Sequence, residues 1–127
     1  MIDHVSIPVA DLGRAAGFYD AVLAEIGLRR RKERHGAIGY GPDHRAAPVF
    51  WILARSAHAA KPGPGVHVSF LSPTRAGVDA FHATALRHGA TDAGAPGRRP
   101  QYTQPFYGAF VLDPDGFKIE AVCRVDG

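Results

Sequence analysis

The chain contains an internal repeat. The segment His4-Val5-Ser6-Ile7 returns as His67-Val68-Ser69-Phe70, an offset of 63 positions (67 − 4). Similarity at a fixed spacing indicates that one supersecondary unit occurs twice in the fold. A unit of half this length buries its own sheet face poorly, so we expect the halves to pack together or against another chain. The same offset aligns two further pairs: Phe18 with Phe81, and Leu23 with Leu86.

The first half begins with a strand and a helix. Alternating residues over Ile2–Val9 predict the strand. Asp11 is a candidate N-cap, and apolar residues at helical spacing predict a helix over 12–26 that ends before Gly27. Two more strands are predicted further on, roughly Ile38–Tyr40 and Val49–Leu53.

The second half has the same signals in the same order. Val66–Leu71 predicts a strand, Ser72-Pro73 predicts a helix start, and helical spacing over 74–88 ends at Gly89. Each half therefore contains β-α-β-β, and the pattern leaves one further short strand per half open. The later strands of this half are predicted at Tyr107–Leu112 and Phe117–Val122.

The two units form one predicted domain over residues 1–127. Module 1 covers about 1–60 and module 2 about 65–123, with Lys61-Pro62-Gly63-Pro64-Gly65 as a linker. The predicted fold class is α+β, in which two paired βαβββ modules form a curved sheet around a cleft. A groove between curved sheets is a natural small-molecule cavity.

Composition narrows the class of protein. The single cysteine, Cys123, rules out an internal disulfide framework and a thiolate zinc site. No apolar run reaches the ~20 residues of a membrane helix and no leader is visible, so we expect a cytoplasmic protein with no membrane partner. The basic cluster Arg29-Arg30-Arg31-Lys32 with Arg34 lacks the motifs of nucleic-acid modules, so we interpret it as a solvated strand or helix end.

The segment Asp113-Pro114-Asp115-Gly116 predicts a tight β-hairpin. Proline presets a type I turn, and glycine supplies the left-handed residue of the following bulge. Counting outward from this turn, Leu112 lies opposite Lys118, and Phe110 lies opposite Glu120. Glu120 then sits in an apolar strand, where a carboxylate is costly unless it is paired, exposed or bound to a metal.

Strand parity brings three candidate metal ligands to one face. His4 and His67 alternate with apolar neighbours that pack under the helices, so both face away from them. Glu120 also faces away, because Ile119 and Ala121 take the opposite side. Two imidazoles and one carboxylate suit a divalent metal with open coordination positions. The remaining histidines are expected at the surface: His35, His44, His58, His82 and His88.

The chain resembles the vicinal oxygen chelate superfamily, which includes glyoxalase I, bleomycin resistance proteins and extradiol dioxygenases. The opening from His4 to Asp11 and the final Asp113–Glu120 segment are similar to its first and last motifs. The resemblance implies paired βαβββ modules, a divalent metal (Zn, Ni, Fe, Mn or Co), and His4, His67 and Glu120 as its ligands. It also implies a homodimer, whose modules pair either within a chain or across the two chains.

Departures from the family pattern narrow the activities that the resemblance implies. The repeat places Trp51 opposite Glu120, where glyoxalase I has a fourth, carboxylate ligand. Phe110 replaces the tyrosine of extradiol dioxygenases, and their histidine is missing from residues 101–103. The resemblance therefore implies a glyoxalase-like metalloenzyme of the lyase or isomerase type, with Glu120 as candidate catalytic base and the substrate unknown. Trp51, Phe110 and Tyr102 are the candidate pocket residues.

Two alternatives stay open from the sequence. The first is a small-molecule binding protein for an aromatic compound or antibiotic, in which a metal is absent or incidental and the aromatic walls supply the affinity. The second is a dioxygenase-like metalloenzyme. The metal content of the purified protein discriminates between an enzyme and a binding protein.

Overall fold

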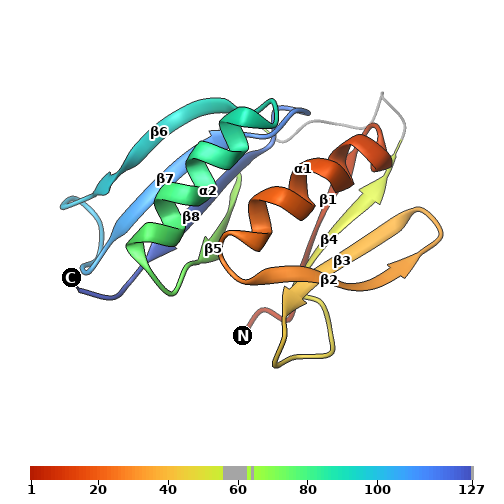
Figure 1. Ribbon diagram of the computed structural model, residues 1–127, viewed down its shortest axis with the longest axis horizontal. Helices are drawn as coiled ribbons and strands as arrows, with labels where there is room; N and C mark the ends of the chain where they lie inside the picture. Colours follow the sequence, from red (N-terminus) through yellow and green to blue (C-terminus); the bar gives the residue numbers. More distant parts are fainter. Residues whose placement is uncertain (56–62, 64, 127) are drawn as a thin grey trace.

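The computed structural model describes residues 1–55, 63 and 65–126, in two successive units of the same element order (Figure 1). The linker prediction falls partly outside these residues, and so does His58. The first unit consists of β1 (Val5–Val9), α1 (Leu12–Ala24), β2 (Leu28–Arg34), β3 (Ala37–Pro42) and β4 (Phe50–Ala54). The second consists of β5 (His67–Leu71), α2 (Arg75–Arg87), β6 (Thr91–Arg98), β7 (Tyr107–Leu112) and β8 (Lys118–Cys123).

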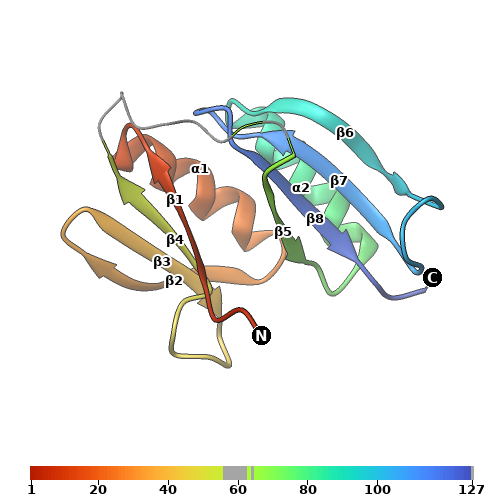
Figure 2. The ribbon, with the colours of Figure 1, turned by 180° about the vertical axis from the view of Figure 1, so that it is seen from behind.

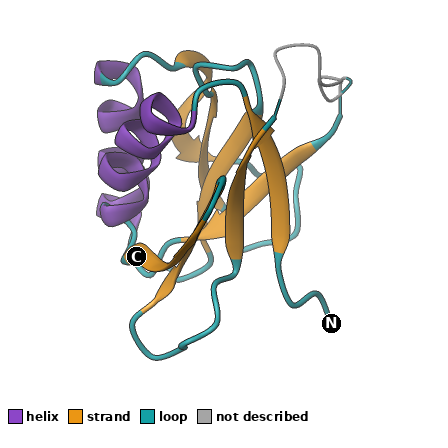
Figure 3. Ribbon diagram, turned by 90° about the vertical axis from the view of Figure 1, so that its right-hand side faces the viewer, coloured by secondary structure: helices purple, strands orange, loops and turns teal. Residues whose placement is uncertain are grey.

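Each unit builds a four-stranded mixed sheet. The strand orders are β1-β4-β3-β2 and β5-β8-β7-β6, with the first strand parallel to the last in each unit. Both helices cover the same side of the two sheets (Figures 1 and 3). The α+β fold with two βαβββ modules is therefore confirmed, and the two sheets stay separate instead of closing into a barrel.

The helices begin and end close to the predicted positions. Asp11 caps α1, and its side chain accepts a hydrogen bond from the backbone N–H of Arg14. The start of α2 was wrongly predicted at Ser72-Pro73. Thr74 is the N-cap instead, because its hydroxyl accepts from the Gly77 N–H and Pro73 lies outside the helix.

The strand that the sequence left open exists in both units, as β2 and β6. Neither has an alternating pattern, because each lies at the edge of its sheet and is mostly exposed. The predicted solvated cluster forms most of β2, where Arg30 forms ion pairs with Asp20 at 2.7 Å and with Glu33 at 2.8 Å. Charged side chains on an edge strand also discourage pairing with a foreign strand.

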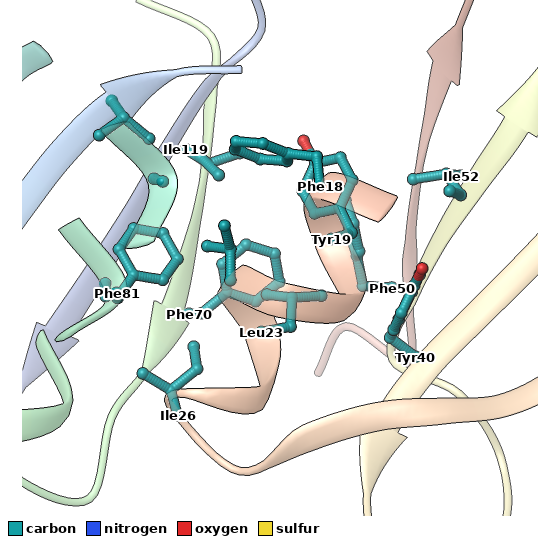
Figure 4. Close-up of a cluster of buried hydrophobic side chains, with 14 of the residues drawn as sticks. Phe18, Tyr19, Leu23, Ile26, Tyr40, Phe50, Ile52, Phe70, Phe81 and Ile119 are labelled. Atoms are coloured by element: carbon teal, nitrogen blue, oxygen red, sulfur yellow. The ribbon is translucent and has the colours of Figure 1, made fainter. Parts of the chain in front are cut away.

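One apolar core spans both modules (Figure 4). Phe50 of β4 meets Phe70 of β5 edge to face, with ring centroids 5.0 Å apart. A buried polar contact joins the modules as well, because the Tyr19 hydroxyl of α1 donates to Asp113 Oδ2 at 2.6 Å. Within the described residues, no helix has the length and apolar character needed to cross a membrane.

Candidate functional site

Glu120 lies in the middle of β8 and is 3 % exposed. Its Oε1 is 3.1 Å from Nε2 of His67 on β5, the neighbouring strand. Its Oε2 is buried and has no hydrogen-bond partner. A carboxylate oxygen left without a partner is costly inside a protein, so this atom marks a place where a ligand would be stabilised.

The β7–β8 hairpin orients this carboxylate as the sequence predicts. The Asp113 N–H donates to the Phe117 carbonyl at 2.8 Å, and Gly116 has a φ of 86°, in the left-handed region. The register then pairs Phe110 with Glu120. Ile119 and Ala121 are fully buried in the core, so Glu120 projects from the face opposite the helices.

An aromatic ring with two cations over it lies beside the His67–Glu120 pair. The Phe110 ring is 5.9 Å from the His67 ring, and the Lys118 ammonium is 4.8 Å from the centre of the Phe110 ring. Arg99 lies over the same ring at 5.7 Å. The pair is therefore walled on one side, while the His67 side chain keeps 36 % of its surface exposed.

Gly108 makes room for the buried carboxylate. A Cβ at this position would lie 2.8 Å from Cε1 of Phe106 and 3.2 Å from Oε2 of Glu120. Any larger residue would therefore push the Phe106 ring or the unpaired oxygen out of place. The absence of a Cβ at position 108 therefore helps to shape the site.

His4 does not join His67 and Glu120 within one chain. It lies just before β1 and is exposed, and its Nδ1 is 2.7 Å from Asp3 Oδ2. Across the described part of the chain, no group of three histidine, cysteine, aspartate or glutamate side chains is close enough to hold a metal ion. The structure thus brings together two of the three predicted ligands and leaves His4 on the other module.

Trp51 occupies in module 1 the position that Glu120 occupies in module 2. Ser6 pairs with Trp51, and Ser69, its repeat partner, pairs with Glu120. Trp51 is 6 % exposed, and the Arg34 guanidinium lies over its ring at 4.4 Å. Trp51 and His4 border a hollow of about 310 Å³ on the first sheet.

The three predicted pocket residues lie at different places on the two modules. Trp51 borders the hollow on module 1, whereas Phe110 belongs to module 2 beside His67. Tyr102 lies between β6 and β7 and is 47 % exposed, with its ring centroid 4.9 Å from that of Phe106. Phe106 itself escaped prediction because it lies just before β7, outside the predicted strand.

One histidine was wrongly assigned to the surface. His82 of α2 is buried, and its Nε2 lies 2.9 Å from Asp92 Oδ1. The repeat carries the signal that would have found it. His82 lies 63 positions after Tyr19, the residue of α1 that also turns a polar atom toward a carboxylate.

With this geometry established, comparisons with known proteins assign the family. The family model described as Glyoxalase/Bleomycin resistance protein/Dioxygenase superfamily matches residues 1–121. The chain belongs to this superfamily. A glyoxalase/bleomycin resistance protein from Albidiferax ferrireducens T118 is similar at 29 % identity, with 96 % of this chain and 98 % of that chain covered and a TM-score of 0.78.

Two further solved structures show the glyoxalase-superfamily fold at lower identity. A glyoxalase/bleomycin resistance protein/dioxygenase family enzyme from Burkholderia phytofirmans PsJN is 19 % identical, covers 98 % of both chains and has a TM-score of 0.72. A glyoxalase I mutant from Zea mays is 21 % identical over 95 % of this chain and 45 % of its own, with a TM-score of 0.69. A search of curated proteins finds no match.

Proposed function

We propose that this glyoxalase-superfamily chain is a divalent-metal-dependent enzyme of the lyase or isomerase type that acts on a small molecule. The observation that carries the proposal is the buried, unpartnered Oε2 of Glu120 beside the His67 imidazole. Structural carboxylates are normally satisfied by protein donors. An oxygen kept unpaired on the face of the sheet away from the core fits a metal ligand better than it fits a structural role.

The donor set suits a borderline or hard cation such as Zn, Ni, Fe, Mn or Co. His67 supplies an imidazole nitrogen and Glu120 a carboxylate oxygen, which are the donor types these metals share. Such a metal supplies Lewis-acid polarisation of substrate oxygen atoms. The chain itself would contribute Glu120 as the base that holds a proton at a carboxylate oxygen, and the Phe110 ring as a wall that excludes water.

We infer that a second copy of the chain supplies His4 as the third ligand. Exposed His4 and exposed His67 are repeat partners on different modules, so each module carries an incomplete site. β1 and β5 are the terminal strands of their sheets, and both lie at the junction between the modules (Figures 1 and 2). Unpaired strand edges favour association with another chain.

An apolar groove at the same junction supports a homodimer. Its volume is about 910 Å³, and its lining includes Ile2, Leu71 and Val125. These three side chains are 79 %, 70 % and 59 % exposed. Large exposed apolar patches mark association surfaces. A second copy that covers this groove would also bring His4 of one chain near the His67–Glu120 pair of the other.

Metal titration tests the site. Protein purified without chelator should bind about one metal per chain. His67→Ala and His4→Ala should each lower the affinity by about 100-fold or more. His88→Ala, which changes an exposed histidine at the C-cap of α2, should not. Unchanged affinity in His67→Ala would overturn the metal proposal. Turnover of hemithioacetals and of catechols then distinguishes lyase from dioxygenase chemistry. Tight binding of an aromatic compound by metal-free protein, without turnover, would support the binding-protein alternative.

A mixing experiment tests whether the site is shared. His4→Ala chains and Glu120→Gln chains should each lack tight metal binding. Refolded together, half of the random dimers are mixed, and each mixed dimer holds one site with no substitution. The mixture should therefore regain about one quarter of the wild-type sites. No recovery, or a monomer in sedimentation at micromolar concentration, would contradict the shared site.

A further inference from the structure

We propose that the hollow on the first sheet binds an oxyanion, a carboxylate or phosphate group of a small molecule. The hollow has a volume of about 310 Å³, enough for such a group together with a small ring or chain. It lies on the face of the sheet away from the helices, because Trp51 projects there from β4. Its polar lining comes from His4, Ser6, Arg34, His35 and Arg55.

The permanently charged side chains that line the hollow are all cationic. Arg34 and Arg55 are permanent cations, and no acidic side chain is among the residues that line the hollow. Within the described residues, neither guanidinium forms an ion pair. Arg30 of the same strand, in contrast, pairs with two carboxylates. Uncompensated arginines around a hollow attract and hold an anion.

The geometry of Arg34 suits bidentate binding. Its guanidinium carbon is 4.4 Å from the centre of the Trp51 ring, so the ring positions the cation. Gly39 on the neighbouring strand leaves room beside this ring, since a Cβ there would lie 2.5 Å from Pro48 and 3.0 Å from Trp51. A guanidinium held over an aromatic ring can present its N–H groups to a planar carboxylate or a phosphate.

The hollow also has a defined relation to the proposed metal site. His4 borders the hollow. In the proposed dimer, this His4 completes the metal site formed by His67 and Glu120 of the other copy, so the oxyanion would lie beside that metal. The conclusion that this oxyanion belongs to the substrate rests on the proposed function. Binding of the anion by Arg34 and Arg55 does not, and it is expected in metal-free protein.

Fluorescence of Trp51 gives a direct test, because this chain has one tryptophan. The protein is kept metal-free with a chelator and titrated with benzoate, phenyl phosphate and the neutral analogue benzamide. Each titration is repeated by calorimetry, because Arg34 lies over the Trp51 ring and a change at Arg34 can alter the fluorescence by itself. Benzoate or phenyl phosphate should produce a saturable change, and the stronger of the two identifies carboxylate or phosphate as the preferred group. Benzamide should bind at least about tenfold more weakly.

Substitutions then place the anion in the hollow. Arg34→Gln and Arg55→Gln should each weaken anion binding by about tenfold or more. Lys32→Gln removes the same charge from the same strand without touching the hollow, and it should change binding by less than about twofold. Equal binding of benzamide, or unchanged binding in both arginine variants, overturns the proposal. Metal titration of the same samples is independent, so either proposal can fail while the other stands.

Discussion

The two modules share a backbone and differ in what they place on it. The helices cover 12–24 and 75–87, a constant offset of 63, and the sheets have the same strand order. At one equivalent position, module 1 has Trp51 under a guanidinium and module 2 has Glu120 beside an imidazole. The repeated backbone thus determines where side chains project. The residue at a single equivalent position then determines whether a module presents an aromatic side chain or a candidate metal ligand.

The helices show a second contrast at equivalent positions. Tyr19 of α1 donates to Asp113 in the other module, whereas His82 of α2 contacts Asp92 within its own module. Asp113 is 4 % exposed, whereas the Asp92 side chain is 55 % exposed. One position therefore joins the modules through a buried contact, and its partner makes a contact at the surface.

The largest expected effect comes from the Trp51/Glu120 difference. Glu120→Gln keeps the shape of the side chain and removes its charge, so divalent-metal affinity should fall by about 100-fold or more. Trp51→Phe alters the equivalent position and should leave metal affinity within about threefold. Calorimetric titration measures both. Equal losses in the two variants would show that the modules do not divide these roles.

The Tyr19/His82 difference predicts unequal losses of stability. Tyr19→Phe leaves buried Asp113 Oδ2 without its donor, and the free energy of unfolding should fall by about 1–3 kcal/mol. His82→Gln affects a partner that water reaches, so its loss should be no more than about 1 kcal/mol. Urea unfolding measures both, and a larger loss for His82→Gln would reverse the comparison.

The two carboxyl groups should respond to pH with opposite signs. Burial raises the pKa of Asp113, partly offset by the Tyr19 hydrogen bond, so the unfolded chain ionises it first and stability falls as pH rises through the carboxyl range. The hydrogen bond with His82 lowers the pKa of Asp92, so its contribution is present above the unfolded pKa and is lost as pH falls. Relative to wild type, Asp113→Asn should therefore gain stability as pH rises from about 3 to 7, and Asp92→Asn should lose it. Unfolding curves measured over that range check the signs, and parallel curves would refute them.

The smallest expected effect is the loss of stability when the Arg34 guanidinium over the Trp51 ring is removed. Arg34→Gln removes an exposed cation–ring contact, so stability should fall by only about 0.5–1 kcal/mol. Arg29→Gln, on the same exposed strand and paired at 3.4 Å with Asp43, should cost less than about 0.5 kcal/mol. Chemical denaturation resolves the difference, and equal losses would mean that stacking on the ring adds no stability.

Local signals carried most of what the sequence could predict. The Asp113–Gly116 turn sets the hairpin register by its own geometry, and strand parity then turns Glu120 toward the face that His67 shares. The edge strands β2 and β6 carry no such signal, because exposed strands need no alternation of apolar and polar residues. The position of His4 relative to Glu120 depends on how two separate sheets are arranged, which no pattern within one strand encodes.

The contact between Tyr19 and Asp113 joins residues that are 94 positions apart. A chain that grows from its N-terminus exposes α1 long before the acceptor for its tyrosine has been synthesised. A shorter delay applies to the Phe50 ring, whose neighbour Phe70 belongs to the later module. The nascent first half therefore keeps apolar surface uncovered until the second module is made, and the Tyr19 hydroxyl lacks its acceptor until the final hairpin is made. Truncation before that hairpin should therefore leave this surface incompletely packed and promote aggregation.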